Sequence, residues 1–206
     1  IAAEGAEQMG NTDRKILIVG AGPVGLFAAI ELTRRGFRPR IIDDGDGPTP
    51  LEESRALAVN LRSLQLLEPA GLSPRIVAQS KQVREMRMFA ADRPLAKVDI
   101  MLVGSKYRGL HVLPLGRTER ILLERLAEFG LAPEWRTRFE ALSHHDTHPS
   151  VTLTRPDGSS EEAGFDLVIG ADGAHSAVRR AVALPFAGTA LDQTFYIADY
   201  RYTQDV

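Results

Sequence analysis

The chain has 206 residues, of which 44% are hydrophobic, and its 25 Lys and Arg stand against 27 Asp and Glu for a formal net charge of −2. A chain of this length buries roughly 70% of its unfolded surface, so it needs no crosslinks, and its near-neutral charge gives no reason to expect nucleic acid or an anionic membrane as a partner. The absence of cysteine excludes disulfides, thiolate metal sites and a thiol nucleophile, so redox chemistry would require a cofactor.

The longest apolar stretch, residues 16–30, is too short for a membrane helix. It is interrupted by glycines and a proline and falls below the ~20 residues that a span requires. Residues 1–14 have no basic region ahead of an apolar segment, so they do not resemble a secretory signal. We therefore expect a cytoplasmic protein with no membrane partner.

The first elements predict a βαβ unit. Residues 15–20 and 39–43 are apolar and predict strands, and residues 23–36 between them predict a helix. Gly36 favours the end of this helix and Pro39 prevents its continuation. Two strands joined by such a crossover helix are expected to be parallel.

The turn between the first strand and the helix carries the pattern G-x-G-x-x-G, formed by Gly20, Gly22 and Gly25. In this setting the first glycine allows a tight turn, the second lets the backbone approach a pyrophosphate and the third lets the helix pack on the strand. Pro23 and Val24 open the helix, whose N-terminal amides suit an anion. The turn therefore predicts a dinucleotide site; the alternative is an empty turn.

An acid follows the second strand. Asp43 lies 23 positions after Gly20, close to the offset at which a carboxylate accepts hydrogen bonds from a ribose diol. Asp44 is adjacent and joins the candidate binding residues, although we expect it to be the more solvated of the two because it lies past the strand end.

The rest of the chain predicts further elements in order. Leucines at helical spacing up to Pro69 predict a core helix. The other predictions are an antiparallel pair at 83–89 and 95–103, a helix at 118–129, a meander of short strands at 133–138, 139–145, 150–155 and 161–165, an apolar strand at 165–170 with a second glycine turn, and a helix ending near 183.

Three histidines, His144, His145 and His148, cluster in the sequence. We interpret them as residues of a polar loop, because no helix or hairpin is expected to hold them in the geometry of metal ligands. We therefore predict no metal site.

Five segments together resemble a known family, the FAD-dependent aromatic-ring hydroxylases. These are the class A flavoprotein monooxygenases of p-hydroxybenzoate hydroxylase type, and the similarity is strongest to their phenol- and polyketide-hydroxylase branch. The segments are the turn at 20–25, Asp43, the stretch SRALAVN at 54–60, LPLGRTERIL at 113–122 and GADGAHSAVR at 170–179.

Several residues gain a role only from this resemblance. Arg55 matches an arginine near the FAD pyrophosphate, where a planar guanidinium suits phosphate oxygens; the alternative is a solvated loop arginine. Asp172 and Gly173 match a turn that the family associates with the FAD pyrophosphate, the ribityl chain and NAD(P)H. Arg117 lies where such proteins contact FAD, although Leu115 stands where the family often has glutamine.

Three residues of these motifs carry further expectations. Asp43 stands where the family usually has glutamate, so its shorter side chain must come closer to the ribose or act through water. Ser176 is expected to cap the short helix after the second turn. Arg179 either belongs to the FAD site or pairs with a carboxylate inside the fold.

The resemblance implies an α/β fold: a Rossmann-like FAD-binding domain with a parallel sheet and an inserted antiparallel meander, plus part of a second, β-rich substrate domain. We assign residues 14–82 and 108–187 to the FAD-binding domain and residues 83–107 and 188–206 to an incomplete substrate domain.

The implied function is an NAD(P)H-driven monooxygenase that hydroxylates a small aromatic, phenolic or polyketide-like substrate with molecular oxygen through a flavin C4a-hydroperoxide. The family's later Gly-Asp motif is absent, since Gly45-Asp46 stands in the wrong context, so we expect an N-terminal part that is inactive alone. A halogenase or reductase of the same superfamily, or a non-catalytic nucleotide-binding module, is the alternative. We assign no catalytic residues. The oligomeric state is left open, with a homodimer as one alternative.

Overall fold

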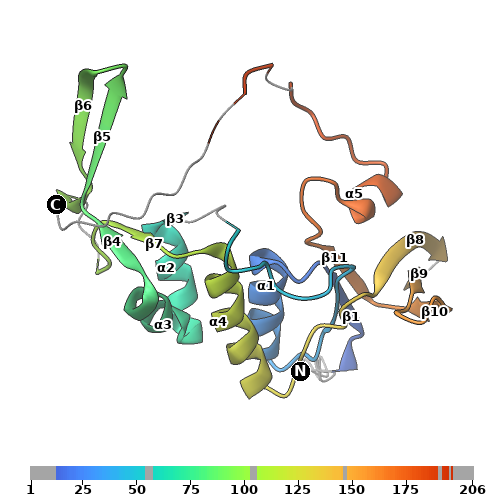
Figure 1. The fold of residues 1–206 in the computed structure, drawn as a ribbon. Coiled ribbons are helices and arrows are strands. Elements are labelled where there is room, and N and C mark those ends of the chain that lie inside the picture. The colour runs from blue at the N-terminus through green and yellow to red at the C-terminus, as the bar shows by residue number, and fades with distance from the viewer. Residues whose placement is uncertain are drawn as a thin grey trace, which may run out of the picture. The chain divides into compact units, whose positions relative to one another are not determined.

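The computed structural model describes residues 13–53, 58–102, 106–145, 148–189, 192–194 and 196. These residues divide into two compact units (Figure 1). The first unit consists of the described residues up to Pro48 together with Leu122–Pro185, and the second consists of those of Thr49–Ile121 and from Phe186 onward.

A parallel sheet forms the centre of the first unit. Its strands are β1 (Ile16–Val19), β2 (Arg40–Ile42) and β11 (Leu167–Gly170), in the order β11-β1-β2. Both neighbours of β1 run parallel to it, and all four β1 residues are buried. The parallel pairing predicted for the first two strands is therefore confirmed.

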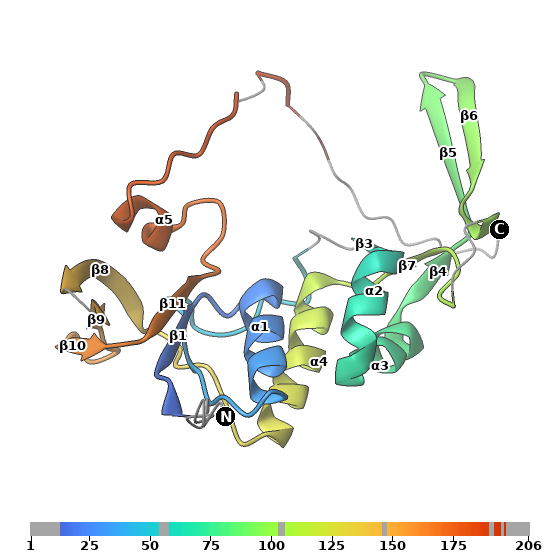
Figure 2. The same ribbon diagram turned by 180° about the vertical axis from the view of Figure 1, so that it is seen from behind.

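Helix α1 (Pro23–Thr33) connects β1 to β2 and packs against β1 (Figures 1 and 2). Gly22 is its N-cap and Pro23 occupies the first helical position, where a missing N–H leaves no helical hydrogen bond unmade. The helix ends before Gly36, which adopts a φ of 92° that favours glycine. The predicted helix is confirmed, with its end three residues earlier.

An antiparallel meander, also predicted, completes the first unit. It contains β8 (Arg138–His145), β9 (His148–Thr154) and β10 (Ser160–Gly164), in the order β10-β9-β8, and the short helix α5 (Ala177–Ala181) follows β11. One hydrophobic cluster joins this meander to the parallel sheet; its buried members are Leu17, Val19, Ile42, Phe139, Val151, Leu153, Phe165 and Val178.

The strand predicted at residues 133–138 is wrong. Only Glu134 forms an isolated parallel bridge, with Ile42, and the chain then turns through Arg136, whose φ is 54°. The amide of Glu134 donates to the carbonyl of Ile41 (2.8 Å), and the amide of Asp43 donates to the carbonyl of Glu134 (3.0 Å). The segment therefore lies beside the end of β2 at one bridge and then turns away into β8.

The polar loop expected around the three histidines is also wrong. His144 and His145 end β8 and His148 begins β9, so all three belong to a hairpin. The pairing continues through polar residues beyond Leu142 and Val151 and ends with His145 opposite His148, because the register of the two strands carries it past the last apolar pair. Among the residues described, no group of three His, Cys, Asp or Glu side chains is placed to hold a metal ion.

The second unit contains a small antiparallel sheet, a helical layer and a separate hairpin. The sheet order is β3-β7-β4, and the helices confirm the predicted leucine stripe, with Leu64 and Leu67 buried. The elements are β3 (Ala58–Val59), α2 (Leu61–Leu67), η2 (Glu68–Ala70), α3 (Leu72–Gln79), β4 (Lys81–Val83), β5 (Glu85–Ala90), β6 (Arg93–Asp99), η3 (Ile100–Leu102), β7 (Leu110–Val112) and α4 (Leu115–Glu128), whose last residues belong to the first unit.

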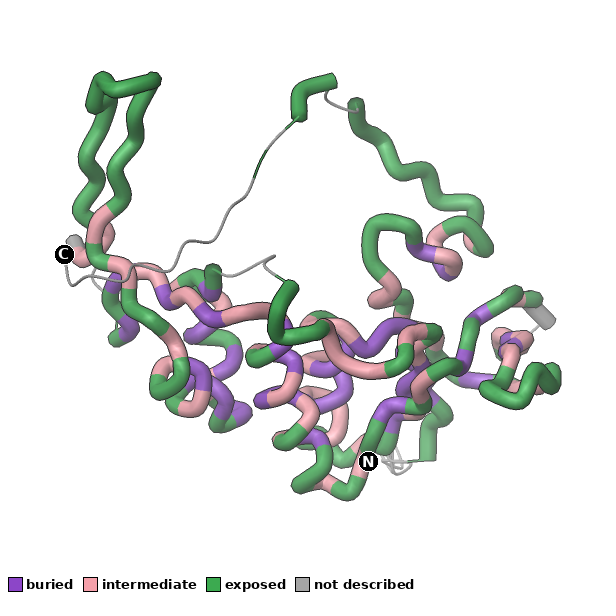
Figure 3. The backbone as a smooth tube through the Cα atoms, in the orientation of Figure 1, coloured by how far each residue is buried: buried purple, intermediate pink, exposed green. Residues whose placement is uncertain are grey.

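Strands β5 and β6 form the antiparallel hairpin that the sequence predicts, and nearly every residue in it is exposed (Figure 3). The predicted bounds 83–89 and 95–103 are wrong in part, because Val83 ends β4 in the other sheet and Ile100–Leu102 forms η3. In the part of the chain that the structure describes, no helix combines the length and the apolar character needed to cross a bilayer.

Candidate functional site

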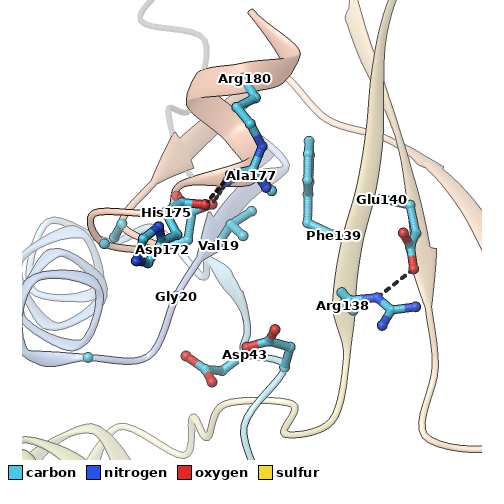
Figure 4. A pocket seen from close by; sticks show the side chains of 14 residues that line it. Val19, Gly20, Asp43, Arg138, Phe139, Glu140, Asp172, His175, Ala177 and Arg180 are labelled. Atoms are coloured by element: carbon cyan, nitrogen blue, oxygen red, sulfur yellow. Dashed lines mark hydrogen bonds and ion pairs between the residues drawn. The ribbon is translucent and has the colours of Figure 1, made fainter. Parts of the chain in front are cut away.

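A cavity of about 630 Å³ opens at the carboxyl ends of the parallel strands in the first unit (Figure 4). In open α/β sheets, ligands bind at this edge. The cavity receives residues from four places: the end of β1, the loop after β2, the start of β8 and the turn between β11 and α5. Its lining consists of Val19, Gly20, Gly22, Asp43, Asp44, Arg138, Phe139, Glu140, Ala171, Asp172, Gly173, His175, Ala177 and Arg180.

The three glycines of the first turn have different surroundings. Gly20 adopts a φ of 105°, and a Cβ there would lie 2.4 Å from the carbonyl oxygen of Ala171. A Cβ at Gly25 would lie 1.9 Å from the carbonyl oxygen of Gly20. Around Gly22, in contrast, no atom beyond the glycine itself and its two chain neighbours lies within 4 Å of the position of a Cβ. Gly20 and Gly25 are thus required by packing, whereas Gly22 leaves the cavity wall open.

The start of α1 supplies hydrogen-bond donors beside this open wall. The first bond of the helix runs from the amide of Leu26 to the carbonyl of Gly22 (3.0 Å), so the amides of Val24 and Gly25 have no acceptor one turn earlier. The positive end of the helix dipole lies at the same place. An open glycine wall next to unsatisfied amides fits a ligand that carries phosphate groups.

Asp43 connects two loops through its carboxylate. Its Oδ2 accepts from the amide of Ala21 (2.6 Å), and its Oδ1 accepts from the amide of Gly45 (2.8 Å). Asp44 is exposed, as expected, and also lines the cavity. The structure therefore brings both acids to the cavity, with one carboxylate engaged by the backbone and the other in contact with solvent.

The second glycine turn packs directly on the first, because the amide of Ala171 donates to the carbonyl of Val19 (2.7 Å). Asp172 accepts from the hydroxyl of Ser176 (2.6 Å) and from the amides of Ala177 (2.6 Å) and Val178 (3.2 Å). This carboxylate thereby satisfies the first amides of α5. Its position in Figure 4, at the cavity wall below α5, is fixed by these bonds.

Ser176 is the N-cap of α5, as predicted: its side chain accepts from the amide of Arg179 (2.9 Å). Arg179 itself donates from Nη1 to the carbonyl of Ala174 (2.9 Å). Both residues therefore take part in holding the turn and the helix together.

The start of β8 contributes cavity residues that the sequence analysis missed: Arg138, Phe139 and Glu140. Arg138 donates from Nε to Glu140 (2.7 Å), and the hydroxyl of Thr154 donates to the same carboxylate (2.6 Å). The Thr154 hydrogen bond, followed by that of Arg138, lowers the pKa of Glu140 below its ordinary value. No local pattern marks these residues, because long-range strand pairing brings them to the site.

Arg40, at the start of β2, connects this strand to Glu134 and to β10. Its guanidinium forms paired hydrogen bonds with Glu134 (2.7 and 2.8 Å) and with Glu161 (2.8 Å each). The bonds from Arg40 outweigh burial and lower the pKa of Glu161 to about 2, and the bonds to Glu161 and then Glu134 raise the pKa of Arg40. Bidentate contacts of this kind fix the orientation of both partners.

The other candidate residues are not part of the cavity lining. Arg117 is an exposed residue of α4 and belongs to the second unit, and Arg55 lies outside the described residues. Pro23, Val24 and Gly25 begin α1 next to the cavity. The structure therefore assembles six predicted residues in one cavity wall: Gly20, Gly22, Asp43, Asp44, Asp172 and Gly173.

Comparison with known proteins identifies relatives for nearly the whole chain. The 6-methylpretetramide 4-monooxygenase of Streptomyces rimosus is 38% identical over 194 residues, which are 93% of this chain and 34% of that protein. The pentachlorophenol 4-monooxygenase of Sphingobium chlorophenolicum is 31% identical over 180 residues, 86% of this chain and 33% of that protein. The chain thus spans about one third of these relatives.

The solved structures give the same result. The flavin-dependent monooxygenase PieE, in complex with FAD and substrate, matches with a TM-score of 0.76 and 25% identity, over 86% of this chain and 34% of that one. The profile of the family described as "FAD binding domain" matches residues 13–205. This chain belongs to the FAD binding domain family, in the part that it shares with class A aromatic monooxygenases.

Proposed function

We propose that this chain is the FAD-binding part of an NAD(P)H-driven monooxygenase that hydroxylates an aromatic substrate of phenolic or polyketide-like type with molecular oxygen. The observation that carries the proposal is the open wall at Gly22, which lies beside the first amides of α1, where the helix itself offers no acceptor, in a cavity that the two glycine turns share. Relatives named as aromatic or polyketide monooxygenases support the reaction class.

Each candidate residue has a place in this proposal. The amides of Val24 and Gly25, with Gly22, would face the pyrophosphate, and Pro23 would fix the start of the helix. The acids after β2 would face the adenosine ribose. Gly20 and Gly173 would shape the two turns through their left-handed φ angles of 105° and 76°.

The other three candidates enter as expectations about the longer protein. Asp172 would keep the second turn in register with α5 beside the cofactor. Arg55 and Arg117 would contribute positive charge toward FAD. When bound, FAD would supply electron transfer from NAD(P)H and activation of oxygen, and the residues of this chain would bind and orient it.

The same proposal covers the domain organisation. We propose that residues 14–82 and 108–187 form a Rossmann-like FAD-binding domain and that residues 83–107 and 188–206 belong to a substrate domain. The β1-α1-β2 unit with parallel pairing supports the first assignment, and the exposed β5-β6 hairpin supports the second. A halogenase, a reductase or a non-catalytic nucleotide-binding module is less favoured, because the named relatives are monooxygenases.

Replacing Gly22 tests this proposal, because a methyl group there meets no protein atom but would occupy the wall facing the ligand. We expect Gly22→Ala to keep the melting temperature of the ligand-free chain and to weaken FAD binding at least tenfold, about 1.4 kcal/mol, in a fluorescence titration.

The control is Gly47→Ala. This glycine also has no atom within 4 Å of a Cβ position, but it does not line the cavity. We expect its FAD affinity to equal that of the parent chain. An unchanged affinity in Gly22→Ala, or no FAD binding by the parent chain, would contradict the proposed site.

A further inference from the structure

We infer that Glu119, a buried acid near the start of α4, is a positioning residue: it holds Thr49 and so orders the chain between two proposed FAD contacts. Thr49 lies five positions after Asp44 and six before Arg55. Glu119 itself does not line the cavity. The inference rests on the proposed function, because its main effect is measured as affinity for FAD.

Both oxygens of the Glu119 carboxylate bond to Thr49. Oε2 accepts from the amide of Thr49 (2.6 Å), and Oε1 accepts from its hydroxyl (3.2 Å). Glu119 is only 4% exposed, and a carboxylate is costly to bury unless donors satisfy its oxygens. The burial of this acid and the position of Thr49 therefore depend on each other.

The carbonyl of Thr49 is held by the same helix. Arg120 donates from Nη1 to this carbonyl (3.0 Å) and to the carbonyl of Gly116 (2.7 Å). The amide, the hydroxyl and the carbonyl of Thr49 thus all bond to side chains of α4. In each of these bonds one partner is a charged side chain, which makes the bond stronger than one between neutral groups.

Gly116 lets the helix approach Thr49 this closely. A Cβ at Gly116 would lie 2.2 Å from the carbonyl oxygen of Thr49 and 3.2 Å from that of Pro50. Gly116, Glu119 and Arg120 have the spacing i, i+3 and i+4, so they share one face of α4. We call these three residues the Thr49 clamp. The motif at 113–122 therefore supplies a helix face that fits one backbone segment.

The Thr49 clamp fixes one end of the loop that follows β2. Thr49 is the first residue of the second unit. In the first unit, the other end of the loop is held where the carbonyl of Asp43 accepts from the amide of Thr137 (2.9 Å). Between these ends lies Gly47, which adds backbone freedom. A loop fixed at both ends has less conformational entropy to lose when a ligand binds, so Glu119 acts on the cofactor through this loop.

The first experiment compares Glu119→Ala with Glu119→Gln. Glutamine keeps both bonds, because its carbonyl oxygen accepts from the amide of Thr49 and its side-chain nitrogen donates to the hydroxyl, whereas alanine keeps neither. We expect Glu119→Ala to weaken FAD binding about tenfold or more, since ordering even one further residue on binding costs this much. The fluorescence titration is made at a temperature at which the ligand-free variant is folded. We expect Glu119→Gln to restore the affinity of the parent chain.

Amide hydrogen exchange measures the loop directly. In the ligand-free chain, we expect the peptide covering residues 44–53 to exchange faster in Glu119→Ala, since the amide of Thr49 loses its acceptor. Peptides from β1 should exchange as in the parent chain. The matched control is Glu124→Ala, because Glu124 is an exposed acid of the same helix that does not line the cavity. Its FAD affinity and its exchange should equal those of the parent chain.

Two results overturn the positioning role. The first is an unchanged FAD affinity in Glu119→Ala, even with a lower melting temperature, because the Thr49 clamp would then serve stability alone. The second is an equal loss of affinity in Glu119→Gln, because the charge would then matter and the bonds to Thr49 would not. If Glu119→Ala does not fold, Arg120→Met decides: it removes the bonds to the carbonyls of Thr49 and Gly116 and should weaken FAD binding, and an unchanged affinity overturns the role.

The proposed function and this inference fail in different ways. A parent chain that binds FAD as tightly as Glu119→Ala overturns the role of Glu119 and leaves the FAD site standing. A parent chain that does not bind FAD overturns the FAD site and the positioning role with it, and the exchange of the ligand-free chain then shows whether the Thr49 clamp orders the loop.

Discussion

Strand β1 is apolar throughout, whereas the β5-β6 hairpin mixes apolar with charged residues, and the apolar side chains of the two have opposite surroundings. Every residue of β1 is buried, between two parallel strands and beneath α1. In the hairpin, Phe89 is 58% exposed and Leu95 is 64% exposed. Among the described residues, each hairpin strand pairs only with the other.

The difference shows that burial follows the number of neighbouring layers and strands, and that apolar composition alone does not produce it. A two-stranded hairpin is marginally stable in water and needs a third strand or a packing partner. The apolar side chains of the hairpin form a patch of the kind that marks an interaction surface. Substitutions in β1 should therefore change stability, and substitutions in the hairpin should change surface properties.

The largest effect is expected from a cavity in the parallel sheet. Leu17 is fully buried, so Leu17→Ala should lower the free energy of unfolding by about 3 to 4 kcal/mol. The fluorescence of Trp135, the single tryptophan of the chain, measures this in urea because Trp135 belongs to the first unit. The matched change Leu95→Ala should alter the unfolding free energy, followed by circular dichroism, by less than about 0.5 kcal/mol. Equal losses of unfolding free energy in Leu17→Ala and Leu95→Ala would mean that the hairpin is buried in solution.

A smaller effect is expected from the acid that binds Arg40. The pKa of Glu161 is lowered from 4.5 to about 2, so its ionised form contributes stability above pH 4.5 that is lost as the pH falls toward 2. Glu161→Gln should therefore reduce the unfolding free energy by about 3 kcal/mol at pH 7, and the two proteins should converge near pH 2.

The hairpin again provides the comparison. Glu85 bonds to Lys97 and Arg87, and these bonds, that of Lys97 foremost, lower its pKa. Because the hairpin is solvated, Glu85→Gln should leave the unfolding free energy unchanged within error across the same pH range. If Glu85→Gln changed the pH dependence of the unfolding free energy as much as Glu161→Gln, the two regions would not differ in this property.

The smallest effect on stability, and the most informative about the hairpin, concerns its apolar face. Phe89 and Leu95 line one shallow groove with Arg87 and Lys97. We expect the parent chain to self-associate through this face, and Phe89→Ser with Leu95→Ser to shift sedimentation toward the monomer while leaving the unfolding free energy within about 0.5 kcal/mol. Unchanged association in the double variant would place the contact elsewhere.

Elements with local signals could be predicted from the sequence. The strand, turn and helix from Ile16 to Thr33 combine a short apolar run with glycine and proline at the places where the backbone requires them, and the structure has them there. The hairpin around Ala91 was predicted for a similar reason, because its turn separates two strand-like runs.

Elements that depend on distant partners could not be predicted. The segment at 133–138 has strand-like residues, but its single bridge to Ile42 and the left-handed Arg136 come from its fit against the loop after β2. Phe139 reaches the cavity only because β8 pairs with β9 and packs on the parallel sheet. The engagement of Asp43 and Asp172 by backbone amides is equally invisible in the spacing of their motifs.

The unequal surroundings of the three glycines in the first turn have a consequence for how such a motif persists during evolution. A protein selected only for folding would keep Gly20 and Gly25, because a side chain at either position would clash with the backbone. It could lose Gly22, because a side chain there would point into open space. A library of variants sorted first for expression and then for flavin retention should separate these positions in the same way. Selection for folding is thus expected to act on Gly20 and Gly25, and selection for ligand binding on Gly22.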